Sequence, residues 1–155
     1  MTLARDQLQE LLDTHFPDSG IVVDEAGDGT ARIHQSAGPG HLRPGGTVLG
    51  PVQMALADTA VYLALMSTAG GLFRAVTSSL HISFLRRPAP GSISASARLI
   101  KLGSRLAVGD VLLYSDDAPE PVAQATVTYS LPPADATGDN PDARGGPVHL
   151  PTDSS

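Results

Sequence analysis

A single carboxylate stands inside the most apolar stretch of the chain, GPVQMALADTAVYLALM, residues 50–66. Asp58 has Met54, Tyr62 and Leu65 near it at helical spacing. Desolvation among such side chains disfavours the charged form of a carboxylate and strengthens it as a base. An unpaired buried charge is also costly. Asp58 is therefore either a general base in a dry site or a structural acid satisfied by hydrogen bonds.

Gly50 lies eight residues before Asp58, at the expected start of the same helix. Free amides and the helix dipole favour negative charge there, such as an oxyanion formed during a reaction. The alternative is a glycine needed only to begin the helix. A rise of ~1.5 Å per residue separates the two positions by roughly 12 Å. If both act on one substrate, they must come from different subunits, which predicts a site at a dimer interface.

The surrounding pattern predicts the elements that hold these residues. Leucines at helical spacing indicate a helix over residues 3–15, which Phe16-Pro17 ends. The turn AGDG joins strands over residues 20–25 and 30–35. Pro51 suits the first position of the long apolar helix, and Gly70-Gly71 are its stop signals.

Four further strands are expected after the long helix, as a consecutive antiparallel meander. They cover residues 74–85, 92–103, 105–116 and 121–131. The first alternates Val76, Leu80, Ile82 and Phe84 against mostly polar residues. The fold class is therefore α+β, with one antiparallel sheet of five or six strands wrapped around a long central helix.

Three regions are expected along the chain: an N-terminal helix within 1–19, a sheet-and-helix domain over 20–131, and a disordered tail over 132–155. The tail is rich in Pro, Gly, Asp and Ser and has no periodicity. An open sheet leaves an unpaired edge, which favours self-association.

Composition narrows the function classes. The 155 residues carry a formal net charge of −6, which argues against duplex nucleic acid or an anionic membrane as a partner. The absence of cysteine excludes a thiolate nucleophile and Cys-ligated zinc. The five histidines show no metal-ligand spacing, so no metal is expected: His15, His34, His41, His81 and His149. The acidic N-terminus is unlike a signal peptide and the apolar run is too short to span a bilayer, so a cytoplasmic location is expected.

Two stretches carry a family resemblance. They are HLRPGGTVLGPVQMALADTA (residues 41–60) and AVTSSLHISFLRRPAPGSISASARLIKLGSRLAVGDVLLYSDDAPEPVAQATVTYSL (residues 75–131). In order and spacing they resemble the hotdog thioesterases of the phenylacetic-acid-degradation type, over roughly residues 20–131. The resemblance implies the hotdog fold and a cytoplasmic acyl-CoA thioesterase that acts as a homodimer or dimer of dimers, without a cofactor.

The same resemblance implies roles for three residues. Asp58 matches the acid that activates water or attacks the carbonyl, Gly50 the glycine whose N–H polarises the thioester oxygen, and Thr77 a hydroxyl that orients the water. Two departures stand out. Leu49-Gly50-Pro51 replaces the family's His-Gly-Gly, and Arg43 stands where the family often has Asn. Arg43 is expected to polarise the thioester, bind a carboxylate of the substrate, or pair with Asp58 across the interface.

Further residues are predicted to contact substrate. Arg86, Arg87 and Arg105, with Lys101, form a basic group that fits the phosphates of coenzyme A, although a solvated surface would look the same. Gln53 lies in the first helical turn, where it either meets the carbonyl or is a polar residue at a helix start.

Gly46, in the Gly- and Pro-rich loop 38–51, is also assigned to substrate binding. Small residues on the long helix are expected to leave room for an acyl or aryl group: Ala55, Ala57, Ala60 and Ala64. His81 is expected to be exposed or structural.

Two other function classes compete with hydrolysis. A non-catalytic protein that binds acyl-CoA or lipid is favoured by the missing His-Gly-Gly and by Arg43. A hotdog dehydratase or hydratase needs an Asp and a His together. It ranks last, because no His lies near Asp58 in the motif.

Overall fold

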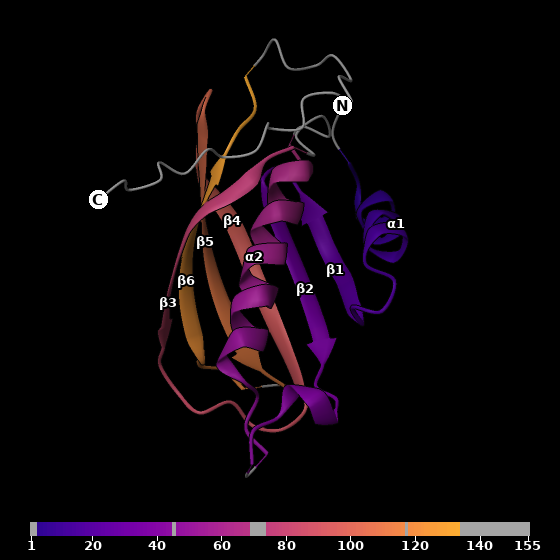
Figure 1. Ribbon diagram of the computed structural model, residues 1–155, viewed down its shortest axis with the longest axis vertical. Helices are drawn as coiled ribbons and strands as arrows, with labels where there is room; N and C mark the ends of the chain where they lie inside the picture. Colours follow the sequence, from indigo (N-terminus) through magenta and orange to yellow (C-terminus); the bar gives the residue numbers. More distant parts are fainter. Residues whose placement is uncertain (1–2, 45, 69–73, 117, 134–155) are drawn as a thin grey trace, which may run out of the picture.

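The computed structural model of the chain describes residues 3–44, 46–68, 74–116 and 118–133. A long helix lies across one face of a six-stranded antiparallel sheet, and a short helix lies beside one edge strand (Figure 1). The elements in chain order are α1 (Arg5–His15), β1 (Ile21–Gly27), β2 (Thr30–Ser36), a 3₁₀ turn η1 (Pro39–His41), α2 (Gly50–Met66), β3 (Val76–Phe84), β4 (Ser92–Leu102), β5 (Leu106–Ser115) and β6 (Ala123–Ser130). The predicted α+β class is confirmed.

The strand order is β1-β2-β4-β5-β6-β3, so the predicted four-strand meander is wrong for its first strand. β3 pairs with β6 at the far edge, and β2 takes the place beside β4. The connection over residues 85–91 contains two prolines and is longer than a tight hairpin loop. The N–H groups of Leu85 and Arg86 both donate to the Val122 carbonyl, so the chain stays with β6 before it crosses over.

Small residues on the sheet let α2 approach closely. The inward positions of the central strands carry many alanines: Ala31, Ala95, Ala97, Ala107, Ala123 and Ala125. At Gly109 of β5, an added Cβ would lie 2.7 Å from both Cγ atoms of Val61. The helix therefore contacts the sheet at a point where no side chain fits, and Val61 is fully buried there.

A bulge in β3 changes which of its residues face the helix. The register with β6 shifts between Thr77 and Ser79, so one extra residue, Ser78, stands in the strand. Thr77 is thereby paired with Tyr129, whose side chain is buried on the helix side. Val76, one of the four apolar residues of the alternating pattern, is 61% exposed.

The two edge strands, β1 and β3, differ in whether side chains bind their outer backbone groups. On β1, Gln9 of α1 accepts from the Val23 N–H (2.7 Å) and donates to the Ile21 carbonyl (3.1 Å). Arg5 Nε also donates to the Val23 carbonyl at 2.8 Å. Side chains of α1 thus occupy backbone groups of Ile21 and Val23 at this edge. Within the described residues β3 pairs with β6 alone, which leaves its other edge open.

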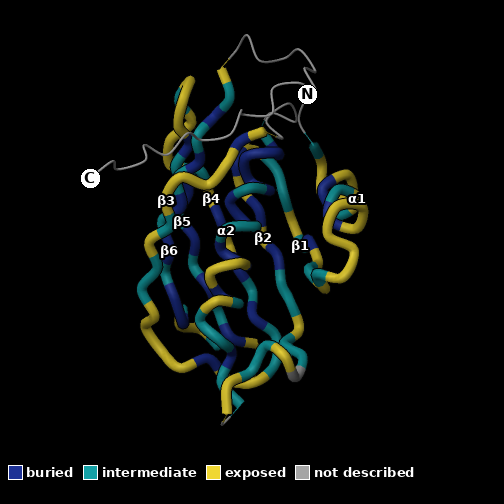
Figure 2. Tube along the Cα trace, in the orientation of Figure 1, coloured by how far each residue is buried: buried dark blue, intermediate teal, exposed yellow. Residues whose placement is uncertain are grey.

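Within the described residues, the first half of α2 is open to solvent on the side away from the sheet (Figure 2). Pro51 and Ala55 are exposed there, and Met54 is 39% exposed. Within the described residues, no helix is long and apolar enough to cross a membrane.

α2 ends at Met66, where the hydroxyls of Ser67 and Thr68 donate to the carbonyls of Ala64 and Leu65. The predicted stop at Gly70-Gly71 and residues 134–155 of the predicted tail lie outside the described residues. The described chain therefore ends this helix with side-chain hydroxyls before the predicted glycines.

Replacement of Gly109 by Ala tests the close approach of α2. We expect Gly109→Ala to lower the free energy of unfolding by about 1–3 kcal/mol, because the new methyl group overlaps Val61. Urea unfolding of the variant and of Gly27→Ala, where an added Cβ meets nothing within 4 Å, gives the comparison. The double variant with Val61→Ala should lose less than the sum of the two single losses. Equal effects at Gly109 and Gly27 would contradict the packing argument.

Candidate active site

Asp58 lies in the middle of α2 and is half-buried. Its Oδ1 accepts hydrogen bonds from Thr77 Oγ1 (2.7 Å) and from the Tyr129 hydroxyl (2.5 Å). The same hydroxyl lies 3.1 Å from the backbone oxygen of Asp58. Oδ2 has no hydrogen-bond partner within the described residues. One carboxylate oxygen is thus fixed by two donors, and the other is left to meet a substrate or a water.

Tyr129 is a part of this site that the sequence analysis did not find. Burial, followed by the hydrogen bond to Asp58, raises its pKa, so the phenol keeps its proton and remains a donor. Alternation along β6 was a signal that Tyr129 faces inward, since Ala125 and Val127 are also buried. That alternation does not say which turn of α2 the side chain meets, because this depends on the register of β6.

A pocket of about 360 Å³ opens beside Asp58. This Asp58 pocket is lined by Leu12, Phe16, Asp58, Thr59, Tyr62, Ala75, Val76, Thr77 and Tyr129. The residues come from the end of α1, from α2, and from β3 and β6 with the segment before β3. Asp58 is the one charged group among them. The carboxylate therefore faces a largely apolar space with hydroxyl groups at its base.

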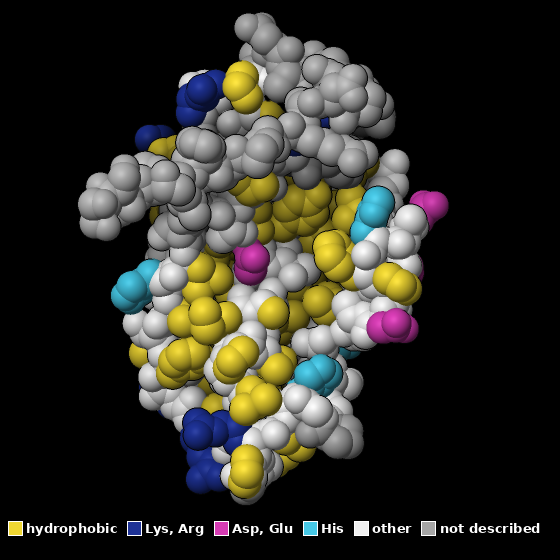
Figure 3. All heavy atoms as spheres, in the orientation of Figure 1, with side chains coloured by type: hydrophobic (Ala, Val, Ile, Leu, Met, Phe, Trp, Pro, Cys, Tyr) yellow, Lys and Arg dark blue, Asp and Glu magenta, His cyan; other side chains and the backbone are white. Residues whose placement is uncertain are grey.

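A second pocket, of about 440 Å³, lies at the start of α2. This Gly50 pocket is lined by Arg43, Thr47, Val48, Gly50, Gln53, Phe84, Leu85, Arg86, Arg87 and Pro88. Basic side chains gather at this end of the molecule, below the hydrophobic surface that runs over α2 (Figure 3). Gly50 and Asp58 thus line different pockets in one chain, as their predicted separation along the helix requires.

The backbone N–H of Gly50, at the start of α2, has no hydrogen-bond partner within the described residues. Pro51 has no N–H. The N–H groups of Val52 and Gln53 donate to the Leu49 carbonyl at 3.2 and 3.3 Å. Within the described residues the Gly50 N–H has no such partner. It can therefore donate to a group that enters the Gly50 pocket.

Gly46 shapes the loop before α2 and is not among the residues that line the pocket. It adopts φ +83°, and its N–H donates to the Arg43 carbonyl at 2.9 Å. The Arg43 N–H donates in turn to the Thr47 carbonyl at 2.7 Å. This turn presents Arg43 and Thr47 to the Gly50 pocket. Within one chain Arg43 does not pair with Asp58, whose partners are hydroxyl groups.

Gln53 is buried beneath the Gly50 pocket. Its Nε2 donates weakly to the Val48 carbonyl, at 3.3 Å, and its Oε1 has no partner within the described residues. Arg86 donates to the Pro121 carbonyl (2.6 Å) and pairs with Glu120 (2.9 Å). Arg87 Nε donates to Thr47 Oγ1 at 2.6 Å. Both arginines are therefore held in place at the pocket.

The predicted basic group is divided by the fold. Arg86 and Arg87 precede β4, whereas Lys101 and Arg105 lie at its other end. β4 has 11 residues, so its ends are roughly 35 Å apart. Successive turns of antiparallel strands fall at opposite ends of the sheet, and Arg105 does not join the Gly50 pocket of its own chain.

The predicted role of the small helix residues needs correction. Ala57, Ala60 and Ala64 are fully buried against the sheet, and Ala55 alone of the four is exposed. These alanines allow close packing rather than room for a substrate. His81 is exposed on β3.

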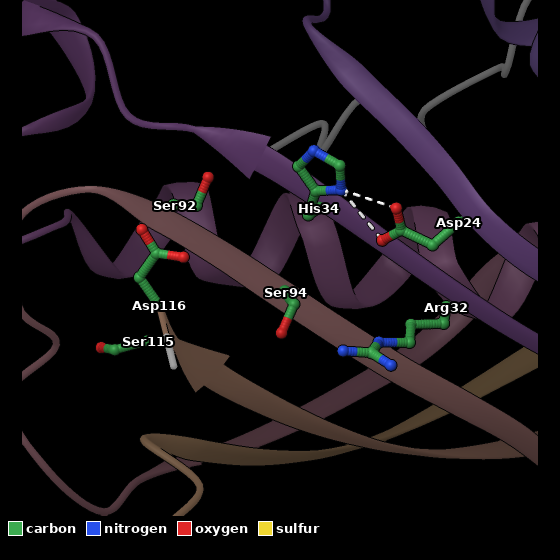
Figure 4. A pocket seen from close by; sticks show the side chains of 7 residues that line it. All are labelled: Asp24, Arg32, His34, Ser92, Ser94, Ser115 and Asp116. Carbon is green, nitrogen blue, oxygen red and sulfur yellow. Dashed lines mark hydrogen bonds and ion pairs between the residues drawn. The ribbon is translucent and has the colours of Figure 1, made fainter. Parts of the chain in front are cut away.

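A third pocket, of about 410 Å³, lies on the face of the sheet away from α2 (Figure 4). His34 Nδ1 pairs there with both carboxylate oxygens of Asp24, each at 2.9 Å. Arg32, Ser94 and Asp116 also line it. The sheet separates these groups from Asp58, so they take no part in the site on the helix side. No cluster suited to a metal ion occurs among the described residues.

Comparison with known proteins decides the family. The model of the thioesterase superfamily matches residues 45–122. The chain belongs to this superfamily. The predicted resemblance to hotdog thioesterases is confirmed, and both Gly50 and Asp58 lie within the matched segment.

Solved structures of several other proteins share the fold. A proposed thioesterase from Silicibacter sp. TM1040 is 39% identical, with a TM-score of 0.76 over 84% of this chain and 93% of that one. A mutant of the phenylacetic acid degradation protein PaaI from Thermus thermophilus is 28% identical, with a TM-score of 0.66 over 76% and 98%. Zebrafish thioesterase superfamily member 2 shares the fold at 22% identity, with a TM-score of 0.77 over 84% and 100%. No protein of curated function matches the chain.

A double-mutant cycle tests the hydrogen bond between Tyr129 and Asp58. We expect Tyr129→Phe to lower the free energy of unfolding by about 1–3 kcal/mol, because a hydrogen bond to a carboxylate is lost. In the Asp58→Ala background, which removes the accepting oxygen, the same change should cost less, with a coupling of about 0.5–3 kcal/mol. Urea unfolding of the four proteins measures this, with Tyr114→Phe on β5 as the control. Additive effects would contradict the assigned hydrogen bond.

Proposed function

We propose that the protein hydrolyses acyl-CoA thioesters to a carboxylate and free coenzyme A. Asp58 Oδ2 takes a proton from a water whose oxygen attacks the carbonyl carbon. The carbon–sulfur bond then breaks, and the proton passes to the departing thiolate. The observation that carries this proposal is a carboxylate beside an apolar pocket, with one oxygen fixed by two hydroxyls and the other without a partner within the described residues.

Thr77 has the chemistry to orient the attacking water. Its hydroxyl donates to Asp58 and retains lone pairs that can accept from a second group. The residue is exposed, so water reaches it. A water that donates to both Asp58 Oδ2 and Thr77 Oγ1 would have its own lone pair directed away from them, toward the thioester.

The Gly50 amide is proposed to stabilise the oxyanion that forms at the thioester carbonyl. One oriented donor of this kind is worth roughly 3 kcal/mol of barrier. The unpaired amide of Gly50 lies at the positive end of the α2 dipole, which favours the same charge. The Gly50 pocket also carries Arg43, Arg86 and Arg87, whose guanidinium groups suit the phosphates of coenzyme A.

A second copy of the chain is proposed to bring Gly50 to Asp58. The edge of β3 is open, and large apolar side chains are exposed on and beside it: Met54, Val76, Phe84 and Leu85. Figure 3 shows hydrophobic side chains gathered over α2 and the neighbouring strand. A two-fold dimer that covers this surface would place the start of one α2 near the middle of the other.

Loss of the acid should abolish turnover without unfolding the protein. We expect Asp58→Asn to lower kcat/KM for acyl-CoA hydrolysis by about 100-fold or more. Release of free thiol measures this, and circular dichroism checks the fold. Asp110→Asn, which changes a half-buried carboxylate on β5, should retain activity. Tight acyl-CoA binding without turnover by the unmodified protein would instead favour the non-catalytic binding function.

Mixed dimers test whether two subunits share the site. Asp58→Asn and Gly50→Val should each be inactive alone, because an added Cβ at Gly50 already lies 3.2 Å from Phe84 Cζ. After the two variants are unfolded together and refolded, activity should recover to roughly a quarter of the wild-type value. About half of the dimers are then mixed, and each mixed dimer holds one intact site. No recovery would show that each chain uses its own Gly50 and Asp58.

A further inference from the structure

The Asp58 pocket has a neighbour on its α1 side. This α1 pocket, of about 410 Å³, is lined by Leu11, His15, Phe16 and Tyr62. Phe16 and Tyr62 line both pockets, so these two side chains form the boundary between them. Figure 3 shows hydrophobic side chains in the recess between α1 and α2.

Phe16 is held at this boundary by its backbone. Its N–H donates to the Leu12 carbonyl at 2.7 Å, and its own carbonyl accepts from the Ser19 N–H at 3.1 Å. Leu12 is buried, and α1 is fastened to β1 through Gln9. The Phe16 residue itself remains 56% exposed. The backbone that carries the ring is thus held in place, whereas the ring contributes little to the core, so it can be removed without loss of the fold.

The side chains that connect Asp58 to Phe16 are aromatic and uncharged. The ring centroids of Tyr129 and Tyr62 are 6.1 Å apart. Tyr62 and Phe16 both line the Asp58 pocket. Apart from Asp58 itself, no charged side chain lines the Asp58 pocket among the described residues. Among the described residues of one chain, this pocket therefore has no cation to pair with a carboxylate at the far end of a substrate, and Asp58 would repel one.

We infer that the Asp58 pocket takes the acyl group, that this group is apolar and uncharged, and that Phe16 of α1 sets its greatest length. This inference rests on the proposed function, since it concerns the acyl group of the same thioester. The acyl group leaves the carbonyl at Asp58, lies along Tyr62 and ends against the Phe16 ring. Removal of that ring would join the Asp58 pocket to the α1 pocket.

Hydrolysis of straight-chain acyl-CoAs of increasing length tests the role of Phe16. With Phe16→Ala, the longest group that is hydrolysed efficiently should become longer. The kcat/KM for the first length rejected by the wild type should rise about 10-fold or more. Ile100→Ala removes an apolar side chain of similar exposure, 57%, on β4 and should leave the length profile unchanged. An unchanged profile in Phe16→Ala, or an equal fall at every length, would overturn the inference.

The charge of the acyl group is tested by a second comparison. An acyl-CoA whose chain ends in a carboxylate should be hydrolysed at least about 10-fold more slowly than the methyl-ended chain of the same length. Comparable rates would overturn the assignment of an uncharged group.

Binding of S-alkyl-coenzyme A thioethers, which carry no carboxylate and cannot be hydrolysed, separates this inference from the proposed function. Calorimetric titration of the full chain with thioethers of each alkyl length requires no turnover. The longest alkyl group that binds should be longer for Phe16→Ala than for the wild type and for Ile100→Ala. If no acyl-CoA is hydrolysed but this shift occurs, the proposed hydrolysis fails and the acyl pocket stands. If binding shows no shift, the inference fails whether or not the protein hydrolyses thioesters.

Discussion

A carboxylate in the middle of an apolar helix needs hydrogen-bond donors to replace lost water, and much of the fold meets that need. The donors, Thr77 and Tyr129, come from the paired strands β3 and β6 and bind the same oxygen of Asp58. Strict alternation in β3 would place Val76 on the helix side. The extra residue at Ser78 brings Thr77 there instead. The geometry of the acid is therefore decided by the register of an edge strand.

The same helix serves both halves of the proposed chemistry. Its first turn supplies an amide without a partner among the described residues, and its middle supplies the acid, too far along the axis to serve the same carbonyl. Close packing against the alanines and Gly109 of the sheet holds both positions on one rigid element. The cost of this arrangement is an uncovered helix face, which a second copy would cover in the proposed dimer.

Local patterns predicted the elements well, because helix stops, prolines and alternation act within a few residues. The turn at Asp28-Gly29 has positive φ at both residues, as a tight hairpin requires. Pairing between distant segments was harder. No local pattern predicts that β3 pairs with β6 or that Tyr129 lies beside Asp58. Nor does one predict that Arg105 and Arg86 lie at opposite ends of the sheet. Thr77 was found by resemblance, and its contact with Asp58 came from the structure.

The contact between α1 and β1 bears on how far copies of this chain can assemble. Gln9 and Arg5 bind backbone groups of Ile21 and Val23 that another strand would need at the start of β1. A sheet with one free edge can add one neighbour through that edge and no more. In the proposed dimer, pairing through the edge of β3 would therefore stop at two chains, and the side chains of α1 would oppose growth into a filament.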